Sequence, residues 1–267
     1  GMGSGLHEEE MSSPEVSEAL KDFARHDLLE VSEKGRREVA CQAWDVKGLL
    51  KASSWQSPSV RGHCKRVLEY GLEGVCIPGI VRRFTDSDID SARELYGDIE
   101  QDDFVAVGFV IPFMPESRRI RVPCVLHHKY VTGRTTPEQV AAMTFAPRTP
   151  ALAALSVMKE SVKGEVKLGV WGSGALEIYT GLPYTDGRSD LDVVLMGASI
   201  DDVRNVVELA DRLEKSFLVR IDVEVQLDEG WGVNGRELVS GRDTVLVKGI
   251  REVKLAMRED LLRYGVT

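Results

Sequence analysis

The stretch Lys167–Met196, KLGVWGSGALEIYTGLPYTDGRSDLDVVLM, decides the fold of the second half of the chain. It opens with a short apolar run up to a glycine, continues with the helical pattern SGALEIYTG, and ends with the apolar run LDVVLM. Asp190 and Asp192 stand two positions apart at the start of that last run. Because successive side chains of a strand point to opposite faces, both carboxylates are expected on one face of a buried strand.

The following residues continue the alternation of strands and helices. Val203, Val206 and Val207 begin an apolar helical face over residues 201–217, and the run LVRIDVEVQL (218–227) alternates strictly, as expected of a strand. Residues 243–249 predict another strand, and residues 250–265 a terminal helix. The pattern is typical of an α+β (α/β-like) fold whose second half holds a mixed sheet flanked by helices.

The first half predicts a smaller α+β unit. Residues 74–83 and 102–113 indicate strands interrupted by Pro and Gly, and residues 86–97 a short helix or loop. Thr136-Pro137 and Thr149-Pro150 are typical helix starts, which we expect to lead from one half to the other. We therefore divide the chain into a disordered tail carrying a tag remnant (1–20), a substrate or partner domain (21–150) and a second domain (151–267).

Composition excludes several classes of protein. No apolar run approaches the roughly 20 residues that span a bilayer, so we expect no membrane association and a cytoplasmic location. A net charge of -9 argues against a nucleic-acid binder. The cysteines lack a CxxC pair, and we expect all four to be reduced core thiols: Cys41, Cys64, Cys76 and Cys124.

Carboxylates recur on the strand that follows. In residues 218–227 the alternation places Asp222 and Glu224 on one face, with valines and isoleucine on the other. If this strand lies beside the one that carries Asp190 and Asp192, three or four carboxylates converge. Such a cluster needs a cation, and a hard divalent ion such as Mg²⁺ is the expected partner.

Gly172 and Ser173 indicate a phosphate site beside these acids. A glycine at the end of a strand lets a ligand approach the backbone, and the free N–H groups of the following helix attract phosphate oxygens. A basic stretch without any acid, residues 117–137, contains Arg118, Arg119 and Arg121. It is either a solvated surface or a cradle for a polyphosphate or an acidic partner.

A Gly-Ser pair followed by D-x-D, with another acid on a later strand, resembles the nucleotidyltransferase (DNA polymerase β-like) superfamily. The long spacing from Ser173 to Asp190 is similar to that of the phosphoribosyl-dephospho-CoA transferases of malonate decarboxylase, also called holo-[acyl-carrier-protein] synthases. The segments RHDLLEV, IVRR, VAVGFVIP, RIDVEV and VLVKG occur in that family's order, so the likeness runs from about residue 25 onward.

The resemblance implies transfer of the prosthetic group from triphosphoribosyl-dephospho-CoA to a serine of the apo acyl-carrier subunit of malonate decarboxylase, with release of pyrophosphate. It implies that Asp190 and Asp192 hold Mg²⁺, and that Asp222, or its rival Glu224, completes the site. Two alternatives stay open: a nucleotidyltransferase with another small-molecule or protein acceptor, and a non-catalytic CoA- or nucleotide-binding homologue.

Further cations are candidate phosphate ligands. Arg188 precedes the acids and Lys248 ends a strand, and each is as readily a surface residue. Arg82 and Arg83 are candidate substrate contacts through the resemblance alone. His26 is expected to be a hydrogen-bonded structural residue rather than a base, since metal-assisted phosphoryl transfer can proceed without one.

Overall fold

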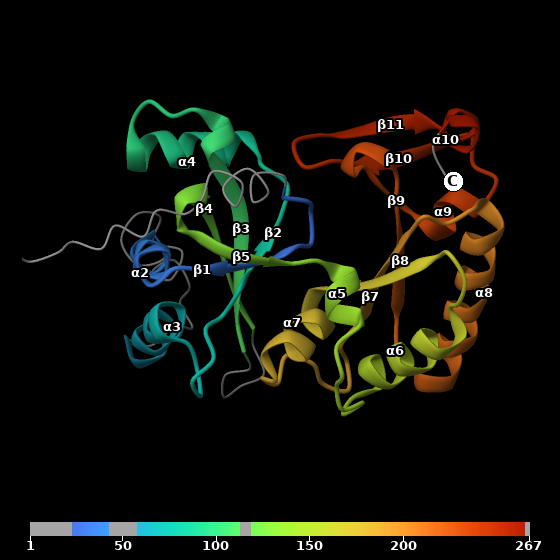
Figure 1. Ribbon diagram of the computed structural model, residues 1–267, viewed down its shortest axis with the longest axis horizontal. Coiled ribbons are helices and arrows are strands. Elements are labelled where there is room, and N and C mark those ends of the chain that lie inside the picture. The colour runs from blue at the N-terminus through green and yellow to red at the C-terminus, as the bar shows by residue number, and fades with distance from the viewer. Residues whose placement is uncertain (1–22, 43–57, 113–118, 265–267) are drawn as a thin grey trace, which may run out of the picture.

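The computed structural model describes residues 23–42, 58–112 and 119–264 (Figure 1). The tail over residues 1–20 and Arg118 lie outside these ranges. Two β-sheets stand side by side in Figure 1, with helices on their outer sides and further helices between them. The expected α+β class is confirmed.

The first sheet is antiparallel and has the strand order β4-β3-β2-β1-β5. Its strands are β1 (Leu28–Val31), β2 (Gly79–Val81), β3 (Phe104–Ile111), β4 (Ile120–His127) and β5 (Val131–Thr135). Among the described residues of this half, the α-helices are α2 (Glu33–Cys41), α3 (Pro58–Tyr70) and α4 (Asp86–Tyr96). Residues 86–96, expected as a helix or a loop, form helix α4. Its start is capped by Thr85, whose side chain accepts from the Asp88 N–H while the Asp88 side chain accepts from the Thr85 N–H.

Two helices connect the sheets, as the Thr-Pro pairs predict: α5 (Pro137–Ala141) and α6 (Pro150–Ser161). Thr136 accepts a hydrogen bond from the backbone N–H of Gln139, whose side chain bonds back to the Thr136 N–H. The boundary near residue 150 falls in this connecting segment and stays a prediction, since the main hydrophobic core runs without interruption through both sheets.

The second sheet is mixed, as expected, and has the strand order β11-β10-β9-β8-β7-β6. Only β7 and β8 pair in parallel. The elements of this half are β6 (Lys167–Trp171), α7 (Gly172–Thr180), β7 (Leu191–Met196), α8 (Ile200–Phe217), β8 (Ile221–Gln226), β9 (Gly232–Asn234), α9 (Gly235–Val239), β10 (Thr244–Lys248), β11 (Val253–Met257) and α10 (Arg258–Tyr264). Helix α8 buries the expected apolar stripe from Val203 to Leu213.

The predicted terminal helix over residues 250–265 is wrong in its first half. Residues 253–257 form strand β11, which pairs with β10 in a register that places Leu255 opposite Leu246. The Gly249 N–H bonds to the carbonyl of Glu252 and closes the turn between them. The alternation of Val253, Leu255 and Met257 is the strand signal that the helical reading passed over.

The cysteine expectation holds for two of the four residues. All four thiols are free, and Cys64 and Cys124 are buried, but Cys41 and Cys76 are exposed. Among the described helices, none combines the length and the apolar character needed to cross a membrane.

Tyr184 connects the two halves through the core. Its side chain is fully buried, and its hydroxyl donates a 2.7 Å hydrogen bond to the carbonyl of Val110 in β3. We expect Tyr184→Phe to lower the free energy of unfolding by about 1–2 kcal/mol, because a buried hydrogen bond is lost.

Tyr179 provides the matched control, since its hydroxyl donates to Glu30 across the same junction but at an exposed bond. Tyr179→Phe is expected to cost less than about 0.5 kcal/mol in urea denaturation. Equal losses in the two variants would contradict the role given to Tyr184.

Candidate active site

The acids lie where three adjacent strands of the second sheet begin or end. In the strand register Trp171 of β6 lies opposite Asp192 of β7, and Asp192 lies beside Asp222 of β8. Val193 and Ile221 point to the other face and are fully buried. The predicted adjacency of the two acidic strands is therefore confirmed, and one row of side chains brings Asp192 and Asp222 together.

Asp192 is the most perturbed carboxyl group of this row. Its pKa is raised from 3.8 to about 7, first by burial and then by the charge of Asp222, a hydrogen bond shared with Asp222 and the charge of Asp190. Arg121 acts in the opposite direction. Asp192 therefore keeps its proton at pH values where an isolated aspartate is ionised.

Gly172 lies directly against Asp192. Its φ is +69°, and a Cβ atom built on it would stand 2.5 Å from Asp192 Oδ2. Only glycine permits this approach, which places the first turn of α7, with its unpaired backbone N–H groups, beside the carboxylate. Gly172 and Ser173 thus lie at the helix start, as predicted.

A cavity of about 450 Å³ opens at this point, between the two halves of the protein. Five of the predicted site residues line it: Gly172, Ser173, Arg188, Asp190 and Asp192. Arg119, which precedes β4, and Arg121, within β4, also line it. Acidic side chains of the second half and cations of the first half therefore share one cavity.

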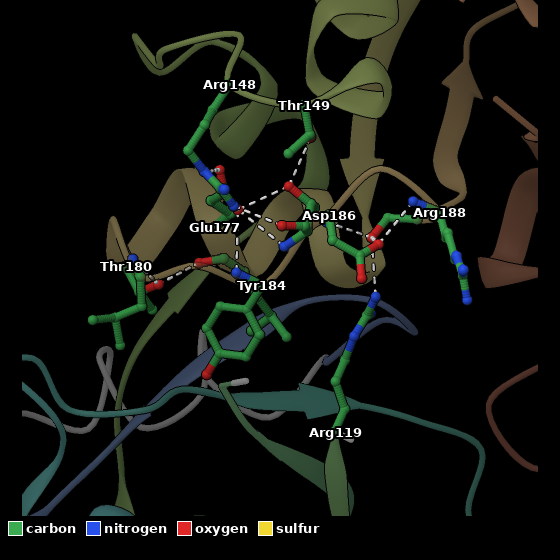
Figure 2. A network of polar contacts seen from close by, with 12 residues as sticks. Arg119, Arg148, Thr149, Glu177, Thr180, Tyr184, Asp186 and Arg188 are labelled. Atoms are coloured by element: carbon green, nitrogen blue, oxygen red, sulfur yellow. Dashed lines mark hydrogen bonds and ion pairs between the residues drawn. The ribbon is translucent and has the colours of Figure 1, made fainter. Parts of the chain in front are cut away.

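The long segment between Ser173 and Asp190 is anchored by a buried acid that the sequence analysis missed, Glu177 of α7 (Figure 2). Arg148 donates to Glu177 at 3.1 and 2.7 Å, and Tyr184 and Thr185 donate from the segment itself at 2.8–3.1 Å. Burial opposes ionisation of Glu177, but these donors outweigh it and lower its pKa. The sequence does contain a signal for this role, because Glu177 is the one acid in an otherwise apolar helical pattern.

The end of this segment is tied to the first half. Ser189 is buried and bonds to Asp186, and its hydroxyl accepts a 3.0 Å hydrogen bond from Arg119 Nη2. Figure 2 shows Arg119 extending from the first half toward Asp186 and Arg188. The position of Asp190, the next residue, therefore depends on both halves.

Glu224 lies on the same face of β8 but has partners of its own. Arg25 donates to it at 3.0 Å and His26 Nε2 lies 2.6 Å from its other oxygen. Burial raises the pKa of Glu224, but His26 and Arg25 outweigh burial and leave it below the ordinary value. Glu224 is thereby neutralised away from the Asp192–Asp222 pair.

His26 also contacts the acid row through Trp171. The two rings stack with centroids 3.9 Å apart and an interplanar angle of 16°. The buried indole Nε1 of Trp171 has no hydrogen-bond partner among the described residues. The prediction that His26 is a hydrogen-bonded structural residue agrees with this geometry.

The remaining predicted cations lie away from the cavity lining. Arg82 forms a bidentate ion pair with Asp88 at 2.7–2.8 Å and thereby supports the start of α4. Arg83 is exposed, and Lys248 lies in β10, two strands from β8, where its carbonyl accepts from Arg25.

The expected convergence of three or four carboxylates does not exist as a preformed cluster. Over the part of the chain that the structure describes, no group of three or more His, Cys, Asp or Glu side chains is arranged to hold a metal ion. The Asp192–Asp222 pair still fits Mg²⁺, which proteins usually bind through one or two carboxylates together with substrate phosphates. A divalent cation would also relieve the repulsion that raises the pKa of Asp192.

Comparison with known proteins places the chain among transferases. Residues 138–259 match the family model described as phosphoribosyl-dephospho-CoA transferase MdcG C-terminal domain. The matched region contains the acids and Gly172 but not Arg119 or Arg121. No solved structure matches the chain.

Curated relatives give the same result. The phosphoribosyl-dephospho-CoA transferase of Bradyrhizobium diazoefficiens is 33% identical over 161 residues, which cover 59% of this chain and 70% of that protein. The protein of the same name from Xanthomonas euvesicatoria is 29% identical over 159 residues, or 58% of this chain and 74% of that protein.

Asp192→Asn is expected to stabilise the metal-free protein. Because folding raises the pKa of Asp192, wild-type stability is lost as pH rises from about 4 through about 7, whereas asparagine does not ionise. In EDTA at pH 8 the variant should gain about 1–3 kcal/mol, and the gain should vanish below pH 4. Denaturant titrations across this pH range measure it, and a gain independent of pH would contradict the assignment.

Gly172→Ala is expected to destabilise the protein more than Gly181→Ala. Both glycines have positive φ, +69° and +73°, but a Cβ at Gly181 meets nothing within 4 Å. The control should lose about 1–2 kcal/mol from backbone strain alone. Contact with Asp192 should add at least about 1 kcal/mol at Gly172. Equal melting temperatures would show that Asp192 moves aside freely.

Proposed function

Because this chain belongs to the phosphoribosyl-dephospho-CoA transferase family, we propose that it transfers a phosphoribosyl-dephospho-CoA group to a protein serine. The proposed donor is triphosphoribosyl-dephospho-CoA, and the proposed acceptor is the apo acyl-carrier subunit of malonate decarboxylase. The serine oxygen forms a bond to the phosphorus next to the ribose. The bond from that phosphorus to pyrophosphate breaks, and the serine proton is released to solvent.

The observation that carries this proposal is the contact of Asp192 with Gly172 in a cavity that Asp190 and arginines also line. Asp222 is not part of this lining, but it lies beside Asp192 on the next strand. Paired acids at a strand end favour a divalent cation, and the first turn of α7 favours phosphate oxygens. Both requirements of a polyphosphate donor are thus met in one cavity. This combination supports assignment to the nucleotidyltransferase class.

Asp190, Asp192 and Asp222 are the proposed catalytic residues and metal ligands. Mg²⁺ held there would stabilise the charge on phosphorus and on the departing pyrophosphate. Asp222 is favoured over Glu224 as the third acid because Arg25 and His26 hold Glu224 in a largely buried pair. Asp222 contacts only the exposed Arg220, at a longer distance of 3.5 Å, among the ion pairs of the described residues. Gly172, Ser173 and Arg188 would contact the donor phosphates. Lys248, Arg82 and Arg83 receive no support from the cavity.

The test combines the protein, magnesium, triphosphorylated donor and an apo acyl-carrier subunit, and then measures the carrier's mass. We expect an increase equal to one phosphoribosyl-dephospho-CoA group and one equivalent of pyrophosphate. Asp190→Asn and Asp192→Asn should slow the transfer at least about 100-fold without unfolding the protein.

Asp201→Asn is the control, since Asp201 is an exposed acid of α8 paired only with Arg204 in the described contacts. It should retain full activity. An unmodified carrier together with modification of another acceptor would assign the protein to a different transferase reaction. Full activity of Asp192→Asn would refute the role of the acid pair.

A further inference from the structure

The wall of the cavity supplied by the first half consists of arginines. Arg119 and Arg121 stand two positions apart at the start of β4, the edge strand of the first sheet that leads into the cavity. The intervening Ile120 is buried in the core, as is Val122. The alternation of β4 therefore fixes both arginines on the side that faces the second half.

These arginines act on the acids across the cavity. Burial lowers the pKa of Arg119, and the charges of Asp186, Asp190 and Asp192 oppose that effect. The charge of Arg121 lowers the pKa of Asp192. Counting Arg188, the cavity lining holds three arginines and three aspartates. A divalent cation on the acids would leave this balanced lining with a net positive charge, and an anion would then be required to compensate it.

The donors in the lining suit a polyphosphate in particular. Guanidinium groups form bidentate hydrogen bonds to phosphate oxygens. The unpaired N–H groups at the start of α7 add further donors to the lining, which includes Gly172 and Ser173. A cavity of about 450 Å³ has room for a chain of phosphates and for the ion they share.

We infer that Arg119 and Arg121 form a phosphate-binding half-site, contributed by the first half of the protein, that holds the pyrophosphate portion of the donor opposite the acids. The identification of pyrophosphate as the leaving portion rests on the proposed function. The binding of inorganic pyrophosphate at this half-site does not depend on the proposed function. Strand β4 of the first half thus completes a site whose acids all lie in the second half.

Arg119 also has a structural contact that the test must separate from ligand binding. Its hydrogen bond to Ser189 holds the segment before Asp190. Ser189→Ala removes that acceptor and leaves both arginines in place. Arg121 is exposed and has no side-chain hydrogen bond or ion pair in the described contacts, so Arg121→Gln tests the charge alone.

The experiment measures binding of inorganic pyrophosphate to the full chain by calorimetry in the presence of magnesium. We expect Arg121→Gln to weaken binding about tenfold, and the Arg119→Gln/Arg121→Gln double variant about 100-fold with a smaller dependence on salt. Ser189→Ala and Arg37→Gln, which removes an exposed charge of α2, should stay within about twofold. Unchanged melting temperatures establish that the variants are folded.

The outcomes are distinct. Wild-type affinity in the double variant, or no pyrophosphate binding by the wild type, would overturn the inference. So would an equal loss in Ser189→Ala, because Arg119 would then act only by holding the segment. Arginine-dependent pyrophosphate binding in a protein that leaves the apo carrier unmodified would uphold the half-site and refute the proposed acceptor reaction.

Discussion

The parallel pairing of β7 with β8, in the register that sets Asp192 beside Asp222, is the constraint on which the site depends. Two carboxylates held this way repel each other, and burial strengthens the effect. The opposite face of the same strands supplies the compensating stabilisation, since Val193 and Ile221 are fully buried in the core. The fold thus maintains an arrangement that is unfavourable by itself, and a bound cation and its phosphates would remove the repulsion.

Neutralisation of Glu224 decides which acids stay available. Glu224 shares a face with Asp222, yet Arg25 and His26 occupy both of its carboxylate oxygens. The pair Arg25–Glu224 packs over Gly232, where a Cβ atom would approach within 2.5 Å of the Glu224 oxygen. His26 then stacks on Trp171, the residue before α7. A segment at the start of the described residues therefore both pairs with one acid of this face and supports the strand end that precedes Gly172.

Periodicity explains which features could be predicted from the sequence. The alternation in β7 and β8, the Gly-Ser pair at the start of α7 and the apolar stripe of α8 are local patterns, and the structure contains each of them. The partners of Glu224 lie 198 and 199 residues away in the chain, and no local pattern encodes such a pairing. The prediction of a helix over strand β11 was wrong for another reason. The apolar residues of so short a run fit a helical and a strand spacing about equally.

The long segment between Ser173 and Asp190 is held by contacts with both halves of the protein. A segment of that length needs its own anchors, and Glu177 supplies them by accepting hydrogen bonds from Arg148, Tyr184 and Thr185. Tyr184 and Ser189 then fasten the segment to the first sheet, through Val110 and Arg119. Since Asp190 directly follows Ser189, any shift of one sheet relative to the other would move this acid together with the arginines. The positions of Asp190 and Arg119 are therefore coupled by the hydrogen bond from Arg119 to Ser189, the residue before Asp190, as well as by charge.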